Sequence, residues 1–212
     1  RPIWTFTAML TGMLLSMLAV GWLTWEHSLR AESEGFQRQL SVRVAGLTQR
    51  VDRYRTLPEV LSLDNELRRA LQAPLTAADV DRLNRKLERA NGASQASTLT
   101  LINHQGIALA ASNWQAERNN VGNDYSFRPY VQQALREGSG RFYGIGTTTG
   151  VPGYFLSQAI YDDHGKTIGL VAIKIALHEL ERQWLRTSDV VVVADEHGVI
   201  FLTSREPWRY RL

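Results

Sequence analysis

The chain has 212 residues, a formal net charge of +3 and no cysteine. The lack of cysteine excludes a disulfide framework, a thiolate metal site and a cysteine nucleophile. The balance of 24 Lys and Arg against 21 Asp and Glu is mixed along the chain and too weak to indicate a nucleic-acid partner.

The first predicted element is a transmembrane helix over residues 3–25. This run has no charged side chain, and about 20 apolar residues are enough for a helix to cross the hydrocarbon core. Trp4, Trp22 and Trp25 lie near its ends, where interfacial aromatic residues are common. A signal peptide is the competing interpretation, but its apolar region would be shorter and a small-residue cleavage pattern should follow. We therefore expect an uncleaved span.

The segment 26–91 is predicted to be helical. Between residues 26 and 55, apolar residues recur every three or four positions from Phe36 to Tyr54, which is a helical period. This stripe either packs on its own domain or pairs with a second copy of the chain as a dimerisation stalk.

Two further helices are predicted before residue 92. The first covers 61–71 and ends before Pro74. The second ends near residue 91 and begins at Thr76, because a threonine followed three residues later by Asp79 is typical of a helix start.

From residue 97 the sequence changes to short β-prone runs separated by turns. Strands are predicted over 98–102, 107–111, 154–161 and 167–177. Two strands, a helix-and-loop excursion and an antiparallel pair form the order found in PAS-like sensor sheets. The predicted fold is therefore α+β, with a PAS-like subdomain over 92–186, although fold analogy alone does not give function.

An internal repeat extends this prediction. Residues 99–112 and 191–204 match at an offset of 92 residues, and each has a β-prone run, a polar turn with glycine, a second run and a serine. A chance match of two hairpins is one explanation, and a duplicated domain is the preferred one. A second PAS-like subdomain would then begin in 187–212 and stay incomplete, which predicts that the chain is a piece of a longer receptor.

Candidate ligand-binding side chains form three patches in the first subdomain. The first contains Tyr125, Arg128 and Tyr130. Arginine offers a planar fork of donors that suits a carboxylate, and tyrosine offers a hydroxyl donor. The alternative is that Arg128 pairs with Asp124 at the start of a helix over 129–136.

The second patch is the glycine-rich stretch 143–153, which contains Thr147, Thr148, Thr149 and Gly150. Hydroxyl and backbone N–H donors of this kind can surround an anion. A phosphate loop is excluded because no lysine follows the glycines and no helix opens there. A flexible hairpin loop remains the alternative.

The third patch is Lys174, which shares one face of the last predicted strand with the small residues Ala172 and Ala176. A solvated lysine or a structural salt bridge is the alternative to ligand binding. With Arg128, it supplies the two cationic groups that a small molecule with two carboxylates requires.

The sequence predicts no catalytic residue and no metal site. It has no Ser-His-Asp spacing, no paired-carboxylate pattern and no metal motif such as HExxH. These absences disfavour a membrane-anchored hydrolase.

Several strings resemble the four-carbon dicarboxylate transport sensor histidine kinases. They are Phe127-Arg-Pro-Tyr130, Tyr143-Gly-Ile-Gly-Thr-Thr-Thr-Gly150, Pro152-Gly-Tyr-Phe-Leu-Ser157 and the strand of Lys174. The resemblance covers the whole chain and implies a periplasmic double-Cache domain whose membrane-distal subdomain binds succinate, fumarate or malate. It implies that the ligand contacts are Tyr125, Arg128, Thr147, Thr148, Thr149, Gly150 and Lys174, with Tyr130 as a further candidate and Tyr154 and Ser157 at the pocket wall.

For the whole protein, the resemblance implies a homodimeric receptor in the bacterial inner membrane. No cofactor is expected in this segment. A cytoplasmic kinase part outside it would use ATP and magnesium and pass a phosphoryl group to a response regulator. The alternatives are the same sensor attached to a chemoreceptor or a nucleotide cyclase, and a sensor of acidic amino acids.

Overall fold

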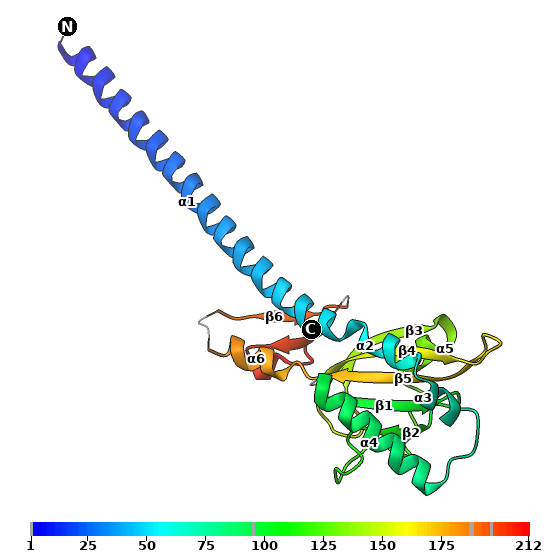
Figure 1. The fold of residues 1–212 in the computed structure, drawn as a ribbon. Coiled ribbons are helices and arrows are strands. Elements are labelled where there is room, and N and C mark those ends of the chain that lie inside the picture. Colours follow the sequence, from blue (N-terminus) through cyan, green and yellow to red (C-terminus); the bar gives the residue numbers. More distant parts are fainter. Residues whose placement is uncertain (1, 95, 187–188, 196) are drawn as a thin grey trace. The chain divides into compact units, whose positions relative to one another are not determined.

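The computed structural model describes residues 2–94, 96–186, 189–195 and 197–212. For some residues of the first and last α-helices it describes the backbone and not the side chain. The chain divides into two compact units after Gln49. Helix α1 (Pro2–Arg55) is continuous (Figure 1), which confirms the helical prediction for 26–55. The expected span over 3–25 falls in α1, where many side chains lie outside the described residues. Within the described residues, no helix is both long and apolar enough to cross a membrane.

The single helix predicted over 61–71 is wrong, because the structure has two short helices there. They are α2 (Leu57–Ser62) and α3 (Asn65–Ala70). Asp64 separates them, since its carboxylate accepts hydrogen bonds from the N–H groups of Glu66 and Leu67 at 2.9 and 3.1 Å and so starts a new helix.

Helix α4 (Ala77–Ser94) begins as predicted. The Thr76 hydroxyl accepts a hydrogen bond from the N–H of Asp79 at 3.2 Å, and the Asp79 carboxylate accepts one from the N–H of Thr76 at 3.0 Å. This reciprocal pair is a capping box. The helix ends three residues later than the expected residue 91.

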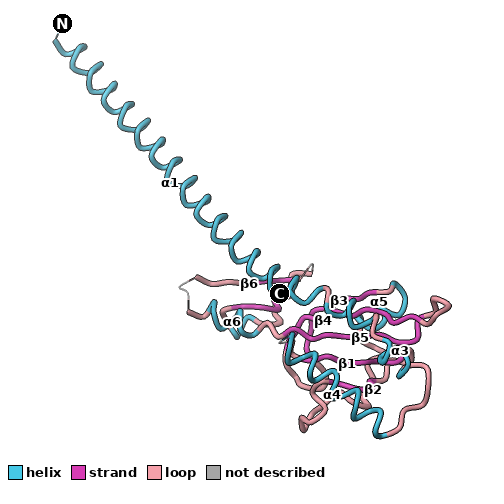
Figure 2. Tube along the Cα trace, in the orientation of Figure 1, coloured by secondary structure: helices cyan, strands magenta, loops and turns pink. Residues whose placement is uncertain are grey.

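The second unit is built on a five-stranded antiparallel sheet of order β2-β1-β5-β4-β3 (Figure 2). Its strands are β1 (Thr98–Asn103), β2 (Ala108–Ala111), β3 (Ser139–Ile145), β4 (Pro152–Tyr161) and β5 (Thr167–Ile175). The α+β prediction of a long helix followed by a PAS-like sheet is therefore confirmed. Strand β3 was not predicted. It lies at the sheet edge and is partly exposed, so its sequence lacks a buried apolar alternation.

The two faces of the sheet have different covers. Helix α5 (Pro129–Glu137) packs against one face, where Val131 and Ala134 join Leu170 and Ala172 in a buried cluster. Helices α2 to α4 cover the other face. There Gly169 leaves room for Leu71, because an added Cβ would lie 2.7 Å from a methyl group of that leucine.

The chain continues into α6 (His178–Trp184), β6 (Val192–Ala194), β7 (Ile200–Thr203) and a 3₁₀ turn, Glu206–Trp208. Strands β6 and β7 form a separate antiparallel pair. This hairpin repeats the β1–β2 hairpin bond for bond. The Ser112 hydroxyl accepts from the N–H of Leu99 at 2.9 Å, and the Ser204 hydroxyl accepts from the N–H of Val191 at the same distance.

A helix also contacts both hairpins at equivalent positions. The side-chain oxygen of Asn84 on α4 accepts from the N–H of Ala111, and that of Glu181 on α6 accepts from the N–H of Thr203, which is 92 residues later. The turn alone would be weak evidence of duplication, because Asp162 forms the same turn between β4 and β5. The serine and helix contacts support the repeat, while the subdomain boundaries stay a prediction.

Candidate ligand-binding site

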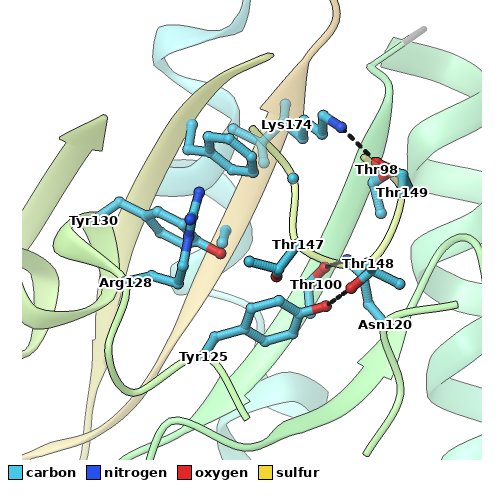
Figure 3. Close-up of a pocket in the computed structure, with 14 residues that line it drawn as sticks. Thr98, Thr100, Asn120, Tyr125, Arg128, Tyr130, Thr147, Thr148, Thr149 and Lys174 are labelled. Atoms are coloured by element: carbon cyan, nitrogen blue, oxygen red, sulfur yellow. Dashed lines mark hydrogen bonds between the residues drawn. The ribbon is translucent and has the colours of Figure 1, made fainter. Parts of the chain in front are cut away.

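A pocket lies over the α5 face of the sheet, under the loop that joins β3 to β4 (Figure 3). Its volume is about 30 Å³, far below the about 300–1,000 Å³ of typical small-molecule sites. In the arrangement described, the loop and the side chains under it leave room for little more than a water molecule. The lining residues are Thr98, Thr100, Asn120, Tyr125, Arg128, Tyr130, Gly146, Thr147, Thr148, Thr149, Phe155, Ala172, Ile173 and Lys174.

Arg128 enters the pocket from the start of α5. Its backbone is extended and Pro129 begins the helix, as expected from the sequence. The guanidinium lies 5.2 Å from the ring centre of Phe142 and 5.3 Å from that of Phe155, at cation–π distance. One of its nitrogens donates a 3.0 Å hydrogen bond to the carbonyl oxygen of Ile145.

Arg128 has no carboxylate partner among the described residues. The alternative in which it pairs with Asp124 is not found. The Asp124 carboxylate instead accepts a 2.7 Å hydrogen bond from the N–H of Ser126. The guanidinium charge is thus not neutralised by an ion pair, although Arg128 also hydrogen-bonds the side chain of Tyr130.

Lys174 enters from β5 on the opposite side of the pocket and is 7 % exposed. Its ammonium donates hydrogen bonds of 2.9 Å to the Thr149 hydroxyl and 2.7 Å to the carbonyl oxygen of Val151. No ion pair of this lysine occurs in the described part of the chain. Burial, and secondarily the positive charge of Arg128, lower the pKa of Lys174 to about 8. A solvated lysine or a structural salt bridge is therefore not what the structure shows.

The loop over the pocket is closed by a further contact. The hydroxyls of Tyr125 and Thr148 are 2.5 Å apart, and Figure 3 shows them meeting above the sheet. Tyr125 is 5 % exposed, and the neighbouring Thr147 also lines the cavity. The structure thus brings the aromatic, cationic and threonine patches together.

Tyr130 forms one wall. Its ring stacks on Phe155 with centroids 4.9 Å apart and an interplanar angle of 7°. Burial raises the pKa of the Tyr130 hydroxyl, so the group stays protonated and can donate a hydrogen bond.

Three of the expected residues do not line this pocket. Gly150 completes the loop with φ of +67°. Tyr154 follows the opposite alternation to Phe155 and points to the other face of β4. The Ser157 hydroxyl donates a 2.8 Å hydrogen bond to the carbonyl oxygen of Tyr130 and so joins β4 to the first turn of α5.

Sequence reasoning missed the polar floor of the pocket. Thr98 and Thr100 lie on β1, opposite Lys174 and Ala172, and the Asn120 amide donates a 2.9 Å hydrogen bond to the Thr100 hydroxyl. The alternation of threonine with leucine along β1 is the signal that could have found them, because it places two hydroxyls on one face of an otherwise apolar strand.

The combined chemistry suits an anion with two charges. Two cations without carboxylate partners face each other across neutral hydroxyl and amide donors. Among the described lining residues there is no Asp or Glu. A buried cation needs an opposite charge or strong hydrogen bonds to be stable, so a dianion would stabilise both groups. In the described part of the chain, no group of three or more His, Asp or Glu side chains could hold a metal ion.

Two known sensor proteins are similar to this chain. The chain is 36 % identical over 170 residues to the C4-dicarboxylate transport sensor protein DctB of Rhizobium meliloti, covering 80 % of the chain and 27 % of that protein. It is 32 % identical over 178 residues to DctB of Pseudomonas aeruginosa, covering 84 % of the chain and 29 % of that protein. The chain thus spans less than a third of these relatives. No family model matches it.

Among solved structures, the sensor domain of the V. cholerae histidine kinase DctB matches with a TM-score of 0.80 and 29 % identity, over 85 % of this chain and 69 % of that one. The ligand-binding domain of the Pseudomonas fluorescens chemoreceptor CtaA, in complex with L-serine, matches with a TM-score of 0.59 and 16 % identity, over 85 % of this chain and 76 % of that one. At that identity, the second likeness concerns the fold alone.

Proposed function

The chain belongs to the family of DctB-type C4-dicarboxylate sensor proteins, as a homologue of their Cache-type sensor domain, and on this premise we propose that it binds a four-carbon dicarboxylate of the succinate, fumarate or malate type. The observation that carries the proposal is the pair of cations, Arg128 and Lys174, which enter one pocket from opposite sides and have no carboxylate partner among the described residues.

Each cation takes one carboxylate of the ligand. Arg128 binds the first with the donors of its planar fork. Lys174 has three N–H donors, and two of them are used by Thr149 and Val151, so the third serves the second carboxylate. Tyr125 and the threonines add neutral donors around the ligand.

The absence of an acidic lining residue disfavours an acidic amino acid. The α-ammonium of aspartate would be desolvated in the pocket without an opposite charge from the described lining, which is costly. A dicarboxylate without an amino group avoids this cost.

The activity of the whole protein is part of the proposal, because the chain spans less than a third of its curated relatives. We propose that it is the periplasmic sensor of a homodimeric histidine kinase in the bacterial inner membrane. The kinase part, outside this chain, would use ATP and magnesium and phosphorylate a response regulator. This segment supplies ligand recognition and needs no cofactor for it.

Isothermal titration of the full chain with succinate, butyrate and L-aspartate tests the ligand proposal. We expect one succinate to bind per chain, and butyrate and aspartate to bind at least about tenfold more weakly, since each lacks one favourable charge contact or adds an uncompensated one. Equal affinity for succinate and butyrate, or no heat with succinate, would refute it.

A further inference from the structure

The two cations of the pocket also hold the two ends of the loop above it. Arg128 donates to the carbonyl oxygen of Ile145, at the end of β3, and Lys174 donates to that of Val151, immediately before β4. Between these points the loop closes on itself, since the N–H of Gly146 donates to the carbonyl oxygen of Val151 at 3.0 Å. Arg128 therefore contacts the end of β3 directly, and Lys174 is connected to it through Val151 and Gly146.

Tyr143 lies two residues before Ile145 on this strand. Its hydroxyl donates a 2.8 Å hydrogen bond to the carbonyl oxygen of Phe201 on β7, and the two rings have centroids 4.0 Å apart. This contact joins the sensor sheet to the β6–β7 hairpin, 58 residues further along the chain. Strand β3 has only one neighbouring strand in its sheet, so its end is less restrained than the central strands.

Phe201 lies on β7, in the two-stranded sheet that β7 forms with β6. The next but one residue, Thr203, donates its N–H to Glu181 at 3.2 Å, and the buried Glu181 carboxylate accepts two hydrogen bonds of 2.9 Å from Arg209. These bonds connect β7 to α6 and to the segment after β7.

We propose that Tyr143 is the residue that couples the state of the ligand loop to the second hairpin. Arg128 touches the strand on both sides of this tyrosine, through the ring of Phe142 and through Ile145. When a carboxylate engages Arg128, the end of β3 changes its position, and the Tyr143 contact transmits that change to β7. The statement that a bound ligand acts on β7 through Tyr143 rests on the proposed function. The coupling itself does not.

The test is a double-mutant cycle on the full chain, read by hydrogen exchange of the β7 amides without ligand. Thr148→Val removes the hydroxyl that holds the loop to Tyr125. Tyr143→Phe keeps the contact between the two rings and removes the hydrogen bond to Phe201. A single hydrogen bond of this kind corresponds to about a two- to tenfold change in an equilibrium. We expect Thr148→Val to speed β7 exchange about two- to tenfold in the wild-type background and to have no effect on it in the Tyr143→Phe background. Tyr161→Phe, at the far end of β4, is the matched control and should leave the effect of Thr148→Val intact.

Two results would overturn the proposal. One is a β7 response to Thr148→Val that persists in the Tyr143→Phe background. The other is the lack of any β7 response in the wild-type background while the loop amides exchange faster.

Adding succinate then separates this proposal from the proposed function. We expect succinate to slow exchange of both the loop and β7 in the wild type, but of the loop alone in Tyr143→Phe, with the same dissociation constant in both. If succinate protects neither segment, the ligand proposal fails, while the ligand-free cycle still decides the role of Tyr143.

Discussion

Lys174 in the sheet donates a 2.9 Å hydrogen bond to Thr149 in the loop that covers it, although the two residues are 25 apart in the sequence. The ammonium that we propose to bind a carboxylate of the ligand thus also holds the loop over the pocket by a hydrogen bond. Ligand binding and loop closure share one donor group, so they are linked thermodynamically: a ligand that binds better when the loop is closed shifts the loop toward that state.

Replacing the fork of Arg128 tests the first carboxylate contact. Arg128→Lys keeps the positive charge but loses the bidentate geometry and the bond to Ile145. We expect succinate affinity to fall by about 1.5–3 kcal/mol, the scale of hydrogen bonds to charged groups, as measured by titration calorimetry. Arg136→Lys, on the exposed end of α5, is the matched control. Equal loss in both variants would contradict a specific contact.

The lowered pKa of Lys174 predicts a pH dependence of binding. With a pKa of about 8 in the free protein, the lysine loses its charge as pH rises through that value. A bound carboxylate favours the charged form, so affinity should be highest below pH 8 and fall by up to about tenfold per unit above it. Titrations at pH 7 and 9 measure this change. Lys174→Met should bind succinate weakly, with an affinity that does not change between pH 7 and pH 9. A wild type with the same affinity at both pH values would contradict the role of Lys174.

The same group has an effect on stability with the opposite trend. The folded pKa of about 8 lies below the ordinary value of 10.5. Between these values the unfolded chain binds more protons than the folded one, so the free energy of unfolding should rise as pH increases from about 8 to 10.5. Chemical denaturation of the wild type and of Lys174→Met over this range isolates the contribution. The free energy of unfolding of the wild type should rise relative to that of Lys174→Met as pH increases over this range, and a constant difference between the two proteins would count against the burial of a charged lysine.

The Tyr125–Thr148 contact should act as one unit. Tyr125→Phe and Thr148→Val each remove one partner of the hydrogen bond. Each should weaken succinate binding by about 0.5–1.5 kcal/mol, mainly through faster dissociation. The double variant should be no worse than either single one, because the second substitution removes nothing further. Stopped-flow dissociation rates provide the measurement, and fully additive effects would show that the two hydroxyls act independently.

Gly153 should be essential for ligand affinity without touching the ligand. An added Cβ there would lie 2.7 Å from Cε and 3.0 Å from Cγ of Lys174, and 3.0 Å from the carbonyl oxygen of Ile175, so the lysine side chain must shift from its present position. Gly153→Ala should weaken succinate binding about as much as loss of the lysine itself. Gly92→Ala in α4 is the control, since no atom lies within 4 Å of its added Cβ and alanine favours a helix. Unchanged affinity in Gly153→Ala would contradict the placement of Lys174.

The sequence was sufficient to predict the elements whose signal is local. The Thr76–Asp79 helix start, the strands with uninterrupted β-prone runs and the hairpin repeat are all present. The sequence singled out Arg128, Lys174 and the threonine loop by their side-chain chemistry, and the structure places them around one pocket.

What the sequence could not predict depends on pairing between distant segments. Strand β3 is stabilised by its ladder with β4 rather than by its own glycine-containing sequence. Thr98 and Thr100 line the pocket only through the register of β1 against β5, which places Thr98 opposite Lys174. Ser157 was expected at the pocket wall, but its bond to the backbone of Tyr130 gives it a structural role.

The central claim is that two cations each bind one carboxylate of the same ligand. The most direct measurement is the ratio of succinate affinity to butyrate affinity in the wild type and in Lys174→Met, by titration calorimetry on the full chain at pH 7. We expect a ratio of about ten or more in the wild type, because butyrate leaves one cation without a partner, and a ratio near one in the variant. A variant that still prefers succinate as strongly as the wild type would contradict the claim.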